Sequence, residues 1–126
     1  MKILIVEDDP ASLKLARAVL ESGGHLVTFA TTADQAILAL KAARPDAILL
    51  DLQLPGIKGL AVARQCRDEP ATRHIPIIAV TAFAGECERA DAMQAGCDAY
   101  LIKPLNTRAL LQQIESAVFA RAQQFN

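Results

Sequence analysis

An apolar run in the middle of the chain leads directly into a carboxylate. Residues 47 to 60 read AILLDLQLPGIKGL, so the apolar residues 47–50 precede Asp51 and the turn signal Pro55-Gly56 follows it. An unpaired carboxylate at the end of a core strand costs on the order of several kcal/mol unless a partner or a chemical task offsets that cost. The residues that follow the other apolar runs are therefore the candidate partners of Asp51.

Acidic, hydroxyl and ammonium groups follow those other runs. They are Glu7 and Asp8 after residues 2–6, Thr81 after residues 76–80, and Lys103 after residues 99–102. Clustered carboxylates repel one another and favour a hard divalent cation, here Mg²⁺, for which Mn²⁺ could substitute. The cation and the lysine would neutralise incoming phosphate oxygens, and a carboxylate could attack phosphorus in line. These residue types predict a site that accepts a phosphoryl group as an acyl phosphate.

Each of these residues also has an ordinary structural interpretation. Asp9 before Pro10 is typical of a helix N-cap, which is the interpretation we favour for Asp9. Asp51 could cap the turn that follows it. Thr81 alone is more often a strand residue or an N-cap, and Lys103 alone is more often a solvated lysine. All the other candidate groups fall at one edge of the predicted sheet, however, and this favours a shared site.

The apolar runs predict five short strands, and the amphipathic segments between them predict five helices. Continuous rather than alternating hydrophobicity is typical of parallel strands that are covered on both faces. N-cap residues, prolines, glycines and apolar stripes at helical spacing delimit the helices. The predicted strands cover residues 2–6, 25–30, 46–50, 76–80 and 99–102, and the predicted helices cover residues 10–22, 33–43, 59–68, 86–95 and 107–121.

The regular alternation of strand and helix predicts an α/β fold. Short connections allow only right-handed crossovers, which give a doubly wound, five-stranded parallel sheet between two layers of helices. Functional groups gather at the carboxyl ends of the strands in such sheets. We expect the 126 residues to form one domain, with a core of about residues 1–119 and a short tail at 120–126.

Composition and charge argue against several classes of protein. A net charge of −1 gives no electrostatic basis for binding nucleic acid or an anionic membrane. The start MKILIVEDD lacks the apolar region of a secretory signal, and no apolar run approaches the ~20 residues of a membrane helix. Cys66, Cys87 and Cys97 show no metal-site spacing with each other or with His25 and His74, so we expect them to be reduced and mostly structural. A cytoplasmic protein fits these observations.

Four segments resemble one known family in residue type, order and spacing. They are ILIVEDD, LLDLQLPG, AVTAFA and AYLIKP. Over essentially its whole length the chain is similar to the receiver domains of two-component response regulators, including the stand-alone, CheY-like regulators. The resemblance implies a flavodoxin-like fold and a signalling domain that catalyses only its own phosphorylation and dephosphorylation. It also implies a monomer that is phosphorylated by a sensor histidine kinase or a histidine phosphotransfer protein and that binds a downstream protein target.

The resemblance implies a role for each residue around the central carboxylate. Asp51 would be the phosphoacceptor. Asp8 and Asp51 would bind Mg²⁺ directly, Glu7 would bind it through water, and the backbone carbonyl of Gln53 would be the third protein ligand. Gln53 and Phe83 would flank the path of the attacking water, and the bulk of Phe83 would give the phosphorylated form a long lifetime.

The remaining roles concern recognition of the phosphoryl group and the output of the signal. Thr81 would hydrogen-bond the phosphoryl group, Lys103 would pair with it, and Ala82 would leave space for it. The Lys103-Pro104 bond would be cis. Thr81 and Tyr100 would act as the switch that alters the face made by the fourth helix, the fifth strand and the fifth helix.

Three other interpretations are compatible with parts of the sequence. An aspartyl-nucleophile phosphatase also uses Asp, Thr or Ser, Lys and Mg²⁺, but it requires a second aspartate where this chain has Gln53. A flavodoxin-like FMN binder requires a Gly/Ser/Thr-rich phosphate loop after the first strand, where this chain has acidic residues that would repel a phosphate. The chain could also be a receiver domain from a longer hybrid kinase.

Overall fold

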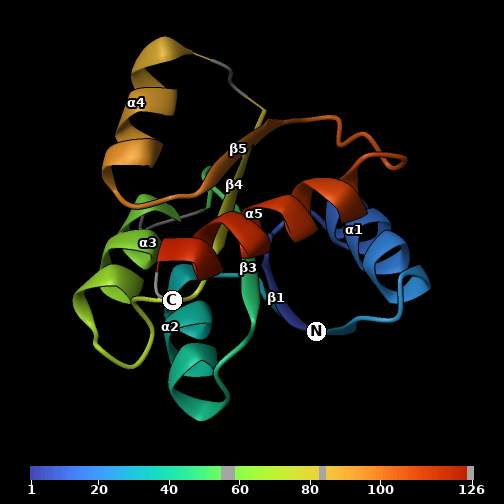
Figure 1. Cartoon of the computed structure of the whole chain (residues 1–126). Coiled ribbons are helices and arrows are strands. Elements are labelled where there is room, and N and C mark those ends of the chain that lie inside the picture. Colours follow the sequence, from blue (N-terminus) through green and yellow to red (C-terminus); the bar gives the residue numbers. More distant parts are fainter. Residues whose placement is uncertain (55–58, 83–84, 125–126) are drawn as a thin grey trace.

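A five-stranded parallel sheet lies at the centre of the computed structural model, which describes residues 1–54, 59–82 and 85–124 (Figure 1). The strand order is β2-β1-β3-β4-β5, so the predicted doubly wound α/β fold is confirmed. None of the helices in these ranges is long and apolar enough to cross a membrane. The elements are β1 (Lys2–Val6), α1 (Pro10–Ser22), β2 (Leu26–Ala30), α2 (Ala33–Ala42), β3 (Ala47–Asp51), α3 (Gly59–Asp68), β4 (Ile77–Thr81), α4 (Glu86–Gln94), β5 (Ala99–Ile102) and α5 (Leu110–Gln124).

Helices cover both faces of the sheet, with α1 and α5 on one face and α2, α3 and α4 on the other (Figure 1). Successive side chains of a strand point to opposite faces. In β1, Ile3 and Ile5 join the core beneath α1 and α5, whereas Leu4 and Val6 join the core beneath the other three helices. The central strands β3 and β4 are buried at every position, which explains their continuously apolar sequences.

The predicted element boundaries agree with the structure to within one residue, except in α5. This helix begins at Leu110 rather than at residue 107. Residues 107–109, which follow Asn106, form turns instead. The Asn106 side-chain oxygen accepts the backbone N–H groups of Arg108 (3.0 Å) and Ala109 (3.3 Å). The helix also continues to Gln124, past the predicted end at 121. The predicted turn at Pro55-Gly56 lies outside the described residues.

An ionic network fastens the amino ends of β4 and β5, the strands that lead to Thr81 and Lys103. The Oδ2 atom of Asp98 accepts the backbone N–H of Ile77 (2.8 Å) and an Nη2 hydrogen of Arg67 (2.9 Å). Its Oδ1 atom accepts Nη1 of Arg121 (3.2 Å), and all three charged side chains are largely buried. Asp98 therefore holds the start of β5 against the start of β4.

Replacing Asp98 by alanine should strongly destabilise the fold. The substitution leaves Arg67 and Arg121 with less charge compensation and the Ile77 N–H without its acceptor, at a cost on the order of 3 kcal/mol. Asp46 provides the matched control, because this exposed residue also precedes a strand and accepts the N–H of Lys2 (2.8 Å). Asp46→Ala should cost about 1 kcal/mol or less. Urea unfolding followed by far-ultraviolet circular dichroism measures both values, and equal losses would contradict the role of the network.

Candidate functional site

The register of β1 and β3 brings acidic residues together at one edge of the sheet. Val6 pairs with Leu50, so the residues that follow them, Glu7 and Asp51, lie side by side. Both of these carboxylates are buried, whereas the neighbouring Asp8 is exposed. Glu7, Asp8 and Asp51 each offer a carboxylate oxygen, and these oxygens lie within 4.8 Å of one another. The sequence prediction that these groups share one site agrees with this placement.

The register of β4 and β5 adds a hydroxyl and an ammonium group to the same edge. Thr81 pairs with Ile102, and the N–H of the next residue, Lys103, donates to the Thr81 carbonyl oxygen (2.8 Å). The side chain of Lys103 reaches both buried carboxylates, with Nζ 2.5 Å from Glu7 Oε1 and 3.4 Å from Asp51 Oδ2. One ammonium group thus bridges the carboxylates that follow β1 and end β3.

Burial and mutual repulsion alter the proton affinity of these groups. Burial raises the pKa of Glu7 from its ordinary value of 4.5 to about 7, and the neighbouring Asp51 acts in the same direction while Lys103 opposes it. Burial lowers the pKa of Lys103, but its bonds and charge interactions with Glu7 and Asp51 outweigh that effect and raise the pKa overall. Charge at this edge of the sheet is therefore only partly compensated by Lys103.

Gln53 occupies the centre of the site with both its backbone and its side chain. Its backbone N–H donates to Asp51 Oδ1 (2.9 Å). Its side-chain Oε1 accepts the N–H of Ala82 (2.9 Å), and its Nε2 donates to Thr81 Oγ1. The same Nε2 atom lies 3.4 Å from both carboxylate oxygens of Glu88 in α4. A single side chain therefore connects the loop after β3, the end of β4 and α4.

Tyr100 in β5 is half-buried and is held by two residues of α4. Its hydroxyl donates to Glu88 Oε1 (3.2 Å), and the guanidinium of Arg89 lies over its ring, 5.5 Å from the centroid. The Glu88 carboxylate consequently connects Gln53 to Tyr100. Phe83, which the sequence prediction placed on the path of the attacking water, lies outside the described residues.

Two residues that contact the site were missed by the sequence interpretation. Glu88 lies in the first turn of α4, where an acidic residue is expected from the helix dipole alone. Gly59 packs so closely beneath Asp51 that an added Cβ would collide with the Asp51 carbonyl oxygen and lie 2.9 Å from Leu52 Cα. The glycine eight residues after Asp51 was a signal that could have been used, whereas Glu88 offered none.

The residues that flank the site have the local structure expected of them. Asp9 is the N-cap of α1, since its Oδ2 accepts the backbone N–H of Ser12 (3.0 Å), so the capping interpretation is confirmed. The Lys103-Pro104 bond is cis, which confirms a second prediction.

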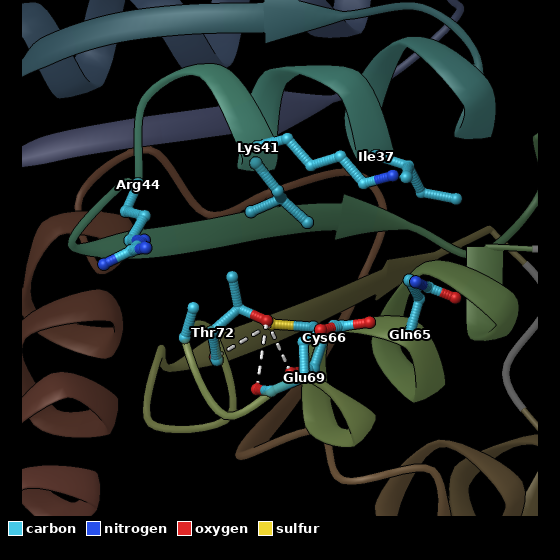
Figure 2. Close-up of a pocket in the computed structure, with 9 residues that line it drawn as sticks. Ile37, Lys41, Arg44, Gln65, Cys66, Glu69 and Thr72 are labelled. Atoms are coloured by element: carbon cyan, nitrogen blue, oxygen red, sulfur yellow. Dashed lines mark hydrogen bonds between the residues drawn. The ribbon is translucent and has the colours of Figure 1, made fainter.

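A separate cavity of about 410 Å³ lies away from the acidic cluster, between α2 and the end of α3 (Figure 2). Figure 2 shows Lys41 and Arg44 on the side of α2, opposite Cys66 and Thr72. Cys66 Sγ donates to the Thr72 carbonyl oxygen (3.1 Å), and Thr72 Oγ1 donates to the Cys66 carbonyl oxygen (2.7 Å). Burial raises the pKa of Cys66, so this thiol is suited to a structural role.

Comparisons with known proteins agree with this geometry. A family model described as the response regulator receiver domain matches residues 3–115. The polar-differentiation response regulator DivK of Brucella anthropi is 38% identical over 114 residues, which cover 90% of this chain and 93% of that protein. The family model spans the acidic cluster as well as Gln53, Thr81, Tyr100 and Lys103.

Solved structures show the same fold. A CheY-like response regulator receiver domain protein from Methanospirillum hungatei has a TM-score of 0.89 and 29% identity, covering 98% of this chain and 97% of that chain. The receiver domain of sensor histidine kinase PA1611 from Pseudomonas aeruginosa, solved with magnesium in its active site cleft, has a TM-score of 0.85 and 36% identity, covering 93% and 96%. The chain therefore belongs to the response regulator receiver domain family of two-component signalling.

Proposed function

We propose that the protein accepts a phosphoryl group on Asp51 from a phosphohistidine of a sensor histidine kinase or a histidine phosphotransfer protein. In this step an Asp51 carboxylate oxygen forms a bond to phosphorus while the bond between phosphorus and the imidazole nitrogen breaks, and the nitrogen keeps the electron pair. The observation that carries the proposal is a buried carboxylate at the end of β3, beside an ammonium group that already contacts it. The family assignment favours this function over the phosphatase and FMN-binding alternatives.

Neighbouring residues are suited to hold the transferred group. Lys103 would exchange part of its interaction with Asp51 for a phosphoryl oxygen, and charge-assisted bonds of this kind are the stronger ones. The Thr81 hydroxyl and the Ala82 N–H would donate to the other oxygens. The small side chain of Ala82 leaves room beside its own amide.

The acidic cluster is suited to hold Mg²⁺. Carboxylates of Asp8 and Asp51, the Gln53 carbonyl and, through water, Glu7 provide only oxygen donors, which is the donor set that hard cations prefer. Mn²⁺ could substitute for it. The similar receiver domain from Pseudomonas aeruginosa, which contains magnesium in its cleft, supports this assignment. A bound cation would neutralise the carboxylates and the incoming phosphoryl oxygens.

The output surface is proposed to be the face made by α4, β5 and α5. Thr81 would move toward the phosphoryl group, and Tyr100 would change its position against α4, so that a local bond biases a two-state surface. Each of the three elements carries an exposed apolar side chain that a protein target could contact: Met93, Ile102 and Phe119. We expect the domain to work as a cytoplasmic monomer that binds a downstream protein target.

Phosphoryl uptake tests the role of Asp51. Acetyl phosphate and Mg²⁺ should add the mass of one phosphoryl group to the wild-type protein and none to Asp51→Asn, because an amide cannot act as the attacking carboxylate. Intact-mass spectrometry measures the adduct. Asp46→Asn, at an exposed aspartate remote from the cluster, should be modified like the wild type. Equal modification of wild type and Asp51→Asn would remove Asp51 from the role.

Metal binding should stabilise the folded protein, because it relieves repulsion among the three carboxylates. With a dissociation constant of about 1 mM and about 10 mM Mg²⁺, mass action gives about 1.4 kcal/mol. Thermal unfolding with and without Mg²⁺ measures this gain as a rise in Tm. Asp8→Asn should lose most of the rise, and an undiminished rise in that variant would place the metal elsewhere.

The raised pKa of Glu7 predicts how stability depends on pH when a chelator has removed divalent metal. Because the pKa is about 7 in the folded state and near 4.5 in the unfolded state, the folded state binds more protons between these values. This group therefore lowers stability as the pH rises through that window, with no effect below it and the full effect above about 7.

Glu7→Gln should remove this dependence. The free energy of unfolding of the variant, relative to the wild type, should rise by on the order of 1 to 3 kcal/mol between about pH 4 and about pH 8. Urea unfolding at a series of pH values in EDTA measures the difference. A difference that stays constant across the window would show that Glu7 titrates normally.

A further inference from the structure

The side chain of Gln53 takes up the hydrogen-bonding groups that a phosphoryl group on Asp51 would need. From this we propose that Gln53 is a positioning residue. Its side chain occupies the Thr81 hydroxyl and the Ala82 N–H in the unphosphorylated site and must be displaced when Asp51 is phosphorylated. The inference rests on the proposed function, but it concerns a contact made before any phosphoryl group arrives. It assigns to the Gln53 side chain a task separate from that of its backbone carbonyl.

Both ends of the Gln53 amide are engaged at the end of β4. Oε1 accepts the N–H of Ala82 at 2.9 Å, and Nε2 donates to the buried hydroxyl of Thr81. The Ala82 N–H can make only one strong bond at a time, so a phosphoryl oxygen and Gln53 Oε1 compete for it. The phosphoryl oxygen is charged and the amide oxygen is neutral, so the phosphoryl group forms the stronger bond and displaces Gln53.

The same amide also reaches the proposed output surface. Nε2 lies 3.4 Å from each carboxylate oxygen of Glu88, and Glu88 Oε1 accepts the hydroxyl of Tyr100 at 3.2 Å. While Gln53 bridges Thr81 and Glu88, α4 is tied to the loop after β3. When Gln53 leaves, Thr81 and Glu88 each lose this donor. One displacement thus changes both ends of the proposed switch.

The backbone of Gln53 remains anchored through its N–H to Asp51 Oδ1 (2.9 Å). Release therefore requires rotation of the side chain and no refolding of the loop. When only a fraction of the protein is in the binding-competent state, the apparent affinity for the ligand is reduced by that fraction. Removing the side-chain bridge should therefore strengthen binding of a phosphoryl mimic, whereas damage to the site would weaken it.

The test compares Gln53→Met with the wild-type chain. Methionine keeps the length of the side chain but has neither the amide N–H nor the carbonyl oxygen. Gln35→Met is the matched control, because Gln35 Oε1 also accepts a backbone N–H and a hydroxyl, both from Thr31 at 2.9 Å, but does so in α2. The same substitution and a similar loss of bonds then occur away from the site.

Two measurements by nuclear magnetic resonance are made on each protein. Without a phosphoryl mimic, hydrogen exchange at the Ala82 amide should be at least several-fold faster in Gln53→Met than in wild type or Gln35→Met, and the Tyr100 ring signals should shift. In a titration with beryllofluoride and Mg²⁺, Gln53→Met should bind about fivefold to tenfold more tightly than the other two proteins.

The outcomes distinguish this inference from the function on which it rests. Unchanged exchange at Ala82, or equal or weaker beryllofluoride binding in Gln53→Met while the wild type binds normally, would overturn the role of Gln53 and leave the proposed function in place. Absence of beryllofluoride binding in all three proteins would overturn the proposed function and the displacement step together. Faster exchange with tighter binding would support the inference.

Discussion

Carboxylates at the ends of adjacent parallel strands repel one another, and the site in this protein is organised around that repulsion. Glu7 and Asp51 must lie together because the register of β1 and β3 aligns Val6 with Leu50, and both are buried by the packing of the strands that carry them. Lys103 offsets part of their charge from the far side of β4. The remaining imbalance is what makes the site receptive to a cation and to chemistry at phosphorus.

Charge compensation differs between the two ends of the parallel strands, here called the amino edge and the carboxyl edge of the sheet. At the amino edge, Asp98 meets two guanidinium groups and a backbone N–H, so its charge is fully used in holding β4 beside β5. At the carboxyl edge, Lys103 contacts two buried carboxylates, those of Glu7 and Asp51. This network supports the register of β4 and β5, which places Thr81 and Lys103 at the carboxyl ends of the same two strands.

Most of the fold and the core of the site could be predicted from the sequence, because each strand is an apolar run whose end is marked by a polar residue. The alternation of elements then placed Asp51, Thr81 and Lys103 at one edge. The exact start of α5 could not be predicted, because Asn106 accepts the amides of Arg108 and Ala109 as an N-cap would, yet residues 107–109 form turns and the regular helix begins only at Leu110. The bridge made by Gln53 could not be predicted either, since it joins residues 28 and 35 positions apart and depends on a side-chain rotamer.

The hydrogen bond from Tyr100 to Glu88 has a spectroscopic consequence. The chain has one tyrosine and no tryptophan, so its near-ultraviolet fluorescence comes almost entirely from this ring in β5. A phenol that donates to a carboxylate emits differently from one in water, and the Arg89 guanidinium over the ring adds to the difference. The protein thus contains an intrinsic optical reporter at the junction of α4 and β5, and no label is required to follow that junction.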